Sequence, residues 1–334
     1  MTARRHILRA LAGLAFLALA APGPAAAEVT NSILRQWKSE FPKADFSKKA
    51  VPFDEIFDVL HRDSIPAIDE PKYVPLGQLR KVADDEPVIG LVIGGEARAY
   101  PLQVMTWHEI VNDTVGGVPV AVTYCPLCNS SIVFDRRVGA QTLSFGVTGR
   151  LRHSDLLMYD RETESWWQQF SGEGVVGAYT GAVLKQIPAR LESLANFRKR
   201  APGGLVLVPK NPAMRAYGQN PYPYYDSSKR PTSYYQGPMP KGLAPLARVV
   251  VVGKEAWSFD LVREKGRIET PELVIAWEAG QLSALDAVMI STAKDVGNVV
   301  VQRKSKSGLR DEPYMVSFAF AFHALVPGGT LHLK

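Results

Sequence analysis

An internal repeat constrains the fold of this 334-residue chain more than any other feature of its sequence. Residues 92–102 align with residues 251–261, which lie 159 positions later, and five of the eleven positions are identical. The first copy consists of an apolar run, Gly94-Gly95 and a second, alternating run, a pattern typical of a β-hairpin. Self-similarity at a fixed distance indicates repeated structural units. The sequence therefore predicts two related β-rich halves; the alternative is two unrelated hairpins that share turn chemistry.

The predicted fold class is accordingly α+β, mainly β, with two related β-rich halves and short helices. Ile33, Leu34 and Trp37 have helical spacing, so the region after the N-terminus is predicted to be helical. A stretch rich in Pro, Tyr, Gly and Ser separates the halves, and it is either a linker that packs its tyrosines on the surface or a loop over a site. The predicted parts are a helical lead (28–72), a first half (73–210), a linker (211–242) and a second half (243–334).

The N-terminus is predicted to be a secretory signal, residues 1–27. Three arginines precede an apolar run of about a dozen residues, too short to span a bilayer, and Ala25-Ala26-Ala27 is a typical cleavage site. Arg4-Arg5 before an apolar pair resembles a twin-arginine signal, with an ordinary signal as the alternative. We therefore expect a periplasmic or secreted protein with no further membrane-spanning segment.

Charge argues against a nucleic-acid partner. The formal net charge is +6, and three of the arginines lie in residues 1–27, so the remaining chain has an excess of only +3. No concentrated basic stripe remains to bind a phosphate backbone.

The only two cysteines, Cys125 and Cys128, stand in the motif CPLC. Exported proteins meet oxidising conditions, but a C-x-x-C bridge closes a very small loop and adds little stability. The motif is followed by Ser-Ser-Ile-Val-Phe, which predicts a strand, whereas a thioredoxin-type dithiol begins a helix. A strand–turn–strand with Asn129 in a left-handed conformation is typical of a metal knuckle or an exposed redox pair.

A metal ion would need more ligands than two thiolates, and His108 is the first candidate. It lies on a helix predicted over residues 102–115, just before the strand that delivers Cys125. On that helix Asn112 would lie one turn after His108, and Glu109 and Asp113 would form the adjacent face. In the dithiol interpretation, His108 would lower the pKa of Cys125 or carry a proton. A buried, hydrogen-bonded core histidine is the structural alternative.

Four further residues are weaker candidates for the site. His323 is predicted to end an aromatic strand in the second half, which lacks both the CPLC motif and the helix of residues 102–115. His153 and Asp155 follow a predicted strand in the first half. Trp166 and Trp167 are adjacent on a predicted strand, so one is expected to face outward, and Trp167 could then cover a pocket.

The runs AYPLQVMTWHEIVNDTVGGVPVAVTYCPLCNSSIVFDRR and FGVTGRLRHSDLLMYDRETESWWQQ resemble the exported bacterial and archaeal family known as domain of unknown function 3179. The resemblance extends from residue 65 to residue 329 and implies no established activity. The family often has Phe-His-Pro near its end, whereas here Ala324 follows His323, which weakens a role for His323.

Two functions from different classes follow. The first is a thiol-dependent or metal-dependent oxidoreductase whose centre is Cys125, Cys128 and His108, with copper, zinc or iron as the possible metal and a small molecule or a redox protein as its partner. The second is a non-catalytic binding module in which CPLC is a structural disulfide. The absence of G-x-S-x-G and H-E-x-x-H motifs argues against a hydrolase.

Overall fold

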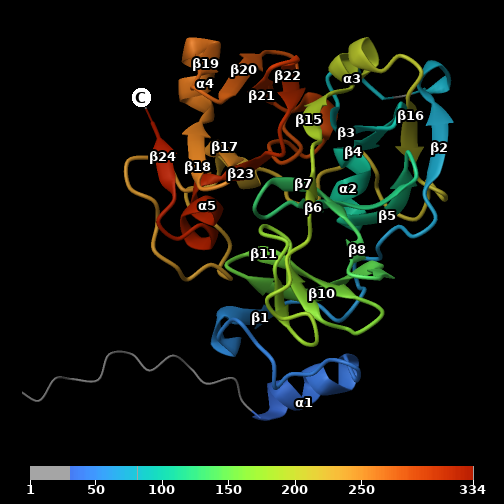
Figure 1. Cartoon of the computed structure of the whole chain (residues 1–334), viewed down its shortest axis with the longest axis vertical. Coiled ribbons are helices and arrows are strands. Elements are labelled where there is room, and N and C mark those ends of the chain that lie inside the picture. Colours follow the sequence, from blue (N-terminus) through green and yellow to red (C-terminus); the bar gives the residue numbers. More distant parts are fainter. Residues whose placement is uncertain (1–30, 81, 334) are drawn as a thin grey trace, which may run out of the picture.

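The computed structural model describes residues 31–80 and 82–333, so the predicted signal of residues 1–27 lies outside the described residues. The described chain is mainly β, with five larger sheets, one two-stranded ribbon and five short helices (Figure 1), which confirms the predicted fold class. None of the helices described is long and apolar enough to cross a membrane. The helices are α1 (Asn31–Glu40), α2 (Leu102–His108), α3 (Leu194–Arg200), α4 (Phe259–Lys265) and α5 (Ala319–Leu325), with 3-10 turns at Phe53–Glu55, Leu76–Gln78, Tyr225–Ser227 and Ile290–Thr292.

The first half contains a five-stranded sheet built on the predicted hairpin. Strands β3 and β4 pair in antiparallel fashion across a two-residue turn, in which Gly94 and Gly95 both have positive φ. Glycine adopts this conformation without steric cost, which is why the Gly-Gly pair marks the turn. The strand order is β15 (Arg190–Ser193), β3 (Pro87–Ile93), β4 (Glu96–Pro101), β16 (Leu205–Val208) and β2 (Lys72–Pro75).

The second half has a four-stranded sheet with the same order of elements. In both sheets a hairpin is followed by a helix, which is α2 in the first half and α4 in the second. A later strand–helix–strand unit then adds one strand to each side of the hairpin. The first of these strands is antiparallel to its neighbour and the second is parallel. The expectation that the second half lacks a counterpart of the first helix is therefore wrong, since α4 directly follows β18 as α2 follows β4. The strand order is β23 (Met315–Phe318), β17 (Arg248–Val252), β18 (Glu255–Ser258) and β24 (Thr330–His332).

A second sheet also recurs after each of these helices. In each half the three strands that follow the helix form an antiparallel meander. In the first half the order is β14 (Gln186–Ile187), β7 (Ser130–Asp135), β6 (Val118–Cys125) and β5 (Ile110–Val115), and in the second it is β19 (Arg267–Glu269), β20 (Leu273–Glu278), β21 (Asn298–Ser305) and β22 (Gly308–Asp311).

The fifth sheet combines four strands of the first half with one strand, Ile56–Asp58, of the N-terminal region. Helix α1 lies against this sheet at one end of the molecule (Figure 1). Trp166 and Trp167 are both fully buried, so the expectation that one faces solvent is wrong. The reason is that Trp37 and Phe41 cover Trp166, with ring centroids 5.1 and 5.2 Å away. The strand order is β1 (Ile56–Asp58), β10 (Phe145–Arg152), β11 (Asp155–Asp160), β12 (Trp166–Gln168) and β13 (Gly174–Val176), and β8 (Arg137–Val138) pairs with β9 (Gln141–Thr142).

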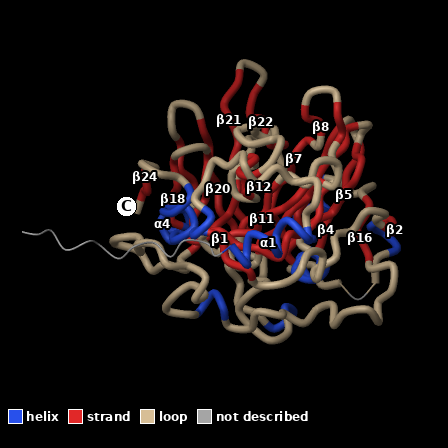
Figure 2. The backbone as a smooth tube through the Cα atoms, turned by 90° about the horizontal axis from the view of Figure 1, so that it is seen from below, coloured by secondary structure: helices blue, strands red, loops and turns tan. Residues whose placement is uncertain are grey.

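The two halves share one hydrophobic core. Strand β23 of the second half packs beside β7 of the first, and β15 packs beside β21. Long loops gather on one side of the strands (Figure 2). The β6–β7 turn, which carries the cysteines, therefore lies where the two halves meet.

Candidate metal centre

The β6–β7 turn places both cysteines on one short loop. Cys125 ends β6 and pairs with Ser130 of β7, so Pro126, Leu127, Cys128 and Asn129 form the turn. The backbone N–H of Asn129 donates to the carbonyl of Pro126 at 3.2 Å, and Asn129 has a φ of 51°. The side-chain oxygen of Asn129 accepts a hydrogen bond from the Tyr124 hydroxyl at 3.1 Å. The predicted strand–turn–strand and the left-handed conformation of Asn129 are thus confirmed.

A third acidic group, Asp155, comes from the fifth sheet. It begins β11, directly after His153 and Ser154, which have positive φ values of 53° and 63°. Its Oδ2 accepts hydrogen bonds from the Gln168 amide at 2.6 Å and from the Phe170 backbone N–H at 2.9 Å. Its Oδ1 is buried and has no hydrogen-bond partner. One carboxylate oxygen of Asp155 is therefore fixed by neutral donors, and the other is left free.

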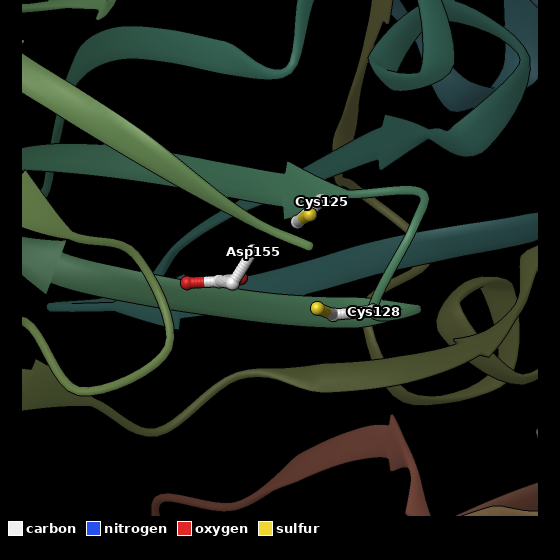
Figure 3. Close-up of side chains that lie close together, drawn as sticks. All are labelled: Cys125, Cys128 and Asp155. Atoms are coloured by element: carbon white, nitrogen blue, oxygen red, sulfur yellow. The ribbon is translucent and has the colours of Figure 1, made fainter. Parts of the chain in front are cut away.

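The two thiols and the carboxyl group of Asp155 converge. The two sulfur atoms and a carboxylate oxygen all lie within 4.8 Å of one another, and all three residues are buried. The cysteines lie on either side of the turn, and Asp155 lies beside them (Figure 3). Both cysteines are free thiols. Sulfur and oxygen atoms at such separations can be ligands of a single metal ion.

Burial raises the pKa of each of these acidic groups and so favours their neutral forms. It raises the pKa of the Cys125 thiol, with the carboxyls of Asp155 and Glu109 adding to the shift, and it raises that of Cys128 well above its usual value. Burial also raises the pKa of Asp155 to about 6. Removing charged groups from water is costly unless an opposite charge compensates. A cation at this place would reverse these shifts, because it would favour the ionised forms of all three groups.

Glu109 is a fourth buried acid near the cluster. Burial and the neighbouring Asp155 raise its pKa to about 8, and its carboxyl has no hydrogen-bond or ion-pair partner among the described residues. The backbone of Glu109 is left-handed, with a φ of 58°, and its N–H closes α2 by donating to Met105. A non-glycine residue in this conformation is strained, and such strain tends to occur at functional sites.

His108 lies outside the cluster. Its Nδ1 is 2.7 Å from the carbonyl oxygen of Pro66, and its Nε2 is 2.8 Å from the hydroxyl of Tyr217. Burial lowers its pKa. These are the contacts of a hydrogen-bonded neutral histidine, and a role for His108 beside the cysteines stays a prediction.

The predicted helix over residues 102–115 is wrong in its second part. Helix α2 ends at His108, and Ile110–Val115 is strand β5, so Asn112 and Asp113 are not on a helix with His108. Asn112 joins β5 to β10 through both backbone groups of Phe145. Asp113 accepts hydrogen bonds from Arg98, Tyr100 and Tyr73. Both residues make structural contacts.

The remaining candidates, His323, His153 and Trp167, do not belong to the cluster of Cys125, Cys128 and Asp155. His323 is exposed and sits on helix α5, so the strand predicted there is wrong. His153 precedes Asp155 by two residues, and its Nε2 lies 3.4 Å from a carboxylate oxygen of Glu55. The Trp167 indole donates to Asp160 at 2.9 Å and is fully buried.

Residues 211–242, which we call the strap, pass over the cysteine turn. The Tyr225 hydroxyl donates to the Leu127 carbonyl at 3.0 Å, and the Thr232 hydroxyl lies 2.9 Å from that of Ser154. The ring of Tyr235 packs on Phe320, with centroids 4.9 Å apart. The structure shows this segment in contact with the cysteine turn, and its role as a cover for a functional site stays a prediction. The sequence signal for this cover is the density of tyrosines in the strap.

A family model described as a protein of unknown function (DUF3179) matches residues 62–329. No curated protein and no solved structure matches the chain.

Proposed function

Because the chain belongs to the DUF3179 family, for which no function is known, we propose a function from the site itself. The protein binds one transition-metal ion through the thiolates of Cys125 and Cys128 and the carboxylate of Asp155. Zinc is the preferred ion, ahead of copper and iron.

The free oxygen of Asp155 is the observation that carries this proposal. Oδ1 is buried without a partner, although the other oxygen has two. An unsatisfied buried acceptor costs about 1–3 kcal/mol, so native proteins rarely keep one without a reason. The sulfur atoms of Cys125 and Cys128 lie within 4.8 Å of an oxygen of this carboxylate. A metal ion would satisfy the carboxylate and both sulfur atoms at once.

The donor set favours zinc. Thiolates are soft ligands and exclude calcium and magnesium, whereas a carboxylate is a poor ligand for Cu(I), which prefers sulfur alone. Zn²⁺ accepts both donor types and is four-coordinate in most protein sites. Three protein ligands would leave one position open, the pattern of a catalytic rather than a structural zinc. Glu109, the next buried acid, is then the group best placed to exchange a proton with a molecule in the open position.

A thiol-redox function is the second candidate, favoured by two free thiols whose sulfur atoms lie within 4.8 Å of each other. Oxidation would form the Cys125–Cys128 disulfide, with two electrons and both thiol protons passing to an external oxidant such as a quinone, which would leave as the quinol. Burial disfavours the thiolate that begins such exchange, so metal binding ranks first.

Elemental mass spectrometry of purified protein tests the proposal. The wild type and Glu86→Gln, a matched change at a buried acid outside the cluster, should each hold close to one zinc per chain, while Cys125→Ser and Asp155→Asn should lose it. A metal-free wild type, or an Asp155→Asn protein that keeps its full metal content, contradicts the proposal. Metal-free protein that cycles between dithiol and disulfide would instead support the second candidate.

Export stays a prediction that rests on residues 1–27. Under this proposal the metal centre would operate in the periplasm or outside the cell.

A further inference from the structure

A cavity of about 380 Å³ opens beside His108, at the end of α2. Three distant segments line it: residues 66–72, the end of α2, and residues 208–217. Its walls are largely apolar, with Pro66, Ile68 and Met214 among them. This size and composition suit a small organic molecule.

The polar part of the cavity is the pair of His108 and Tyr217. The carbonyl of Pro66 can only accept, so the 2.7 Å contact places the imidazole proton on Nδ1 of His108. Nε2 must then accept, and the Tyr217 hydroxyl donates to it at 2.8 Å. The two rings stack at 5.8 Å with an interplanar angle of 17°. With its proton used, the phenol oxygen of Tyr217 is left as an acceptor at the cavity wall.

Two acidic and two basic side chains line the cavity, and one of the basic groups has no ion-pair partner among the described residues. Asp69 pairs with Arg161, and Glu70 pairs with Lys210. Lys72 lines the cavity and has no ion-pair partner among the described residues. The positive charge of Arg215 acts on both His108 and Tyr217. Lys72 is therefore the lining cation that is free to pair with an anionic ligand.

We propose that this cavity is a second ligand site, separate from the metal centre, which takes a small organic acid that carries a hydroxyl group. The carboxylate of the ligand pairs with Lys72, its apolar body contacts Pro66 and Met214, and its hydroxyl donates to the phenol oxygen of Tyr217. His108 is a positioning residue. Its Nε2 accepts the hydrogen bond of the Tyr217 hydroxyl, which leaves the phenol oxygen to accept a hydrogen bond from the ligand.

Titration calorimetry with 4-hydroxybenzoate, benzoate and the neutral 4-hydroxybenzyl alcohol tests the proposal. We expect 4-hydroxybenzoate to bind most tightly. Lys72→Met should weaken both acids about fivefold and leave the alcohol unchanged, since an exposed ion pair contributes up to about 1 kcal/mol. Tyr217→Phe should weaken 4-hydroxybenzoate but not benzoate. Lys306→Met, an exposed lysine on the β21–β22 turn, is the control and should change nothing.

Two results would overturn the proposal: no binding of either acid, or equal binding of 4-hydroxybenzoate by the wild type and both cavity variants. Thermal unfolding and metal content of each variant are measured in parallel. Normal values in Tyr217→Phe show that lost binding comes from the cavity and not from misfolding or from the metal centre.

Discussion

The Ser317 hydroxyl donates a hydrogen bond to the backbone carbonyl of Cys128 at 3.0 Å, across 189 positions of sequence. The N–H of the next residue, Phe318, donates to the same oxygen at 2.9 Å. Two donors from strand β23 thus hold the cysteine turn of the other half. The position of Cys128 in the first half therefore depends on the second half.

Ser317→Ala should lower the free energy of unfolding by about 1 kcal/mol, because it removes one buried hydrogen bond while Phe318 still satisfies the carbonyl. It should also weaken zinc binding, since the turn loses one of its two anchors. Urea unfolding and a competitive zinc titration measure the two effects. The exposed Ser307→Ala is the control. A variant with wild-type stability and zinc affinity would show that β23 does not fix the turn.

The strap should limit access to the thiols. Tyr225→Phe removes the hydrogen bond to Leu127, so opening of the strap should cost about 1 kcal/mol less. In chelator-treated protein, the cysteines of this variant should therefore react about fivefold faster with a water-soluble thiol reagent. The neighbouring Tyr224 is 62% exposed, and Tyr224→Phe is a matched control that should react like the wild type. Equal rates in all three proteins would show that another movement exposes the thiols.

Local turn chemistry explains why part of this structure could be predicted from the sequence. Gly94-Gly95 specifies its hairpin through positive φ, and Asn129 closes the cysteine turn in the same way. These signals lie within a few residues of the structure they determine. The mainly β fold class and the strand–turn–strand of the motif follow from them.

Helix α2 shows where local reasoning stops. Its end is set by Glu109, which adopts the left-handed conformation without being a glycine, so no stop signal marks it. The apolar residues that follow fit a helix as well as a strand. Strand β5 forms because it pairs with β6, which is a tertiary contact.

Asp155 could be named as a candidate from the sequence but not ranked above His108. Its place beside the cysteines depends on how the fifth sheet packs against the β6–β7 turn, and the sequence separation of 27 residues from Cys128 carries no such information. His108 is close to Cys125 in sequence, yet its ring is held by Pro66 and Tyr217 instead.

Removal of the metal should destabilise the protein. A ligand that binds only the folded state adds about 2.7 kcal/mol when its concentration is 100 times its Kd. Chelator should therefore lower the Tm of the wild type by about 5–10 °C and leave Asp155→Asn almost unchanged. Calorimetry with and without chelator, followed by added zinc, measures the shift. If both proteins respond equally to chelator, the stabilising ion does not bind at Asp155.

Glu86 provides a pH-dependent property outside the metal centre. It is buried beside the start of α2, where one carboxylate oxygen accepts the Gln103 N–H at 3.0 Å. Burial raises the pKa of Glu86 from 4.5 to about 8. The folded state therefore holds this proton more tightly than the unfolded state does.

Glu86→Gln should remove one component of the pH dependence of stability. The raised pKa stabilises the fold fully below pH 4.5, and this contribution is lost as pH rises toward 8, by about 1.4 kcal/mol per pH unit at most. Glutamine stays neutral, so the variant should be the more stable protein at pH 8.5, and its advantage should shrink steadily toward pH 5. Urea unfolding of both proteins across this range measures the difference, and the other buried acids cancel because both proteins contain them. A pH-independent difference would mean that Glu86 is ionised in the folded protein throughout, with a cation close enough to hold it so.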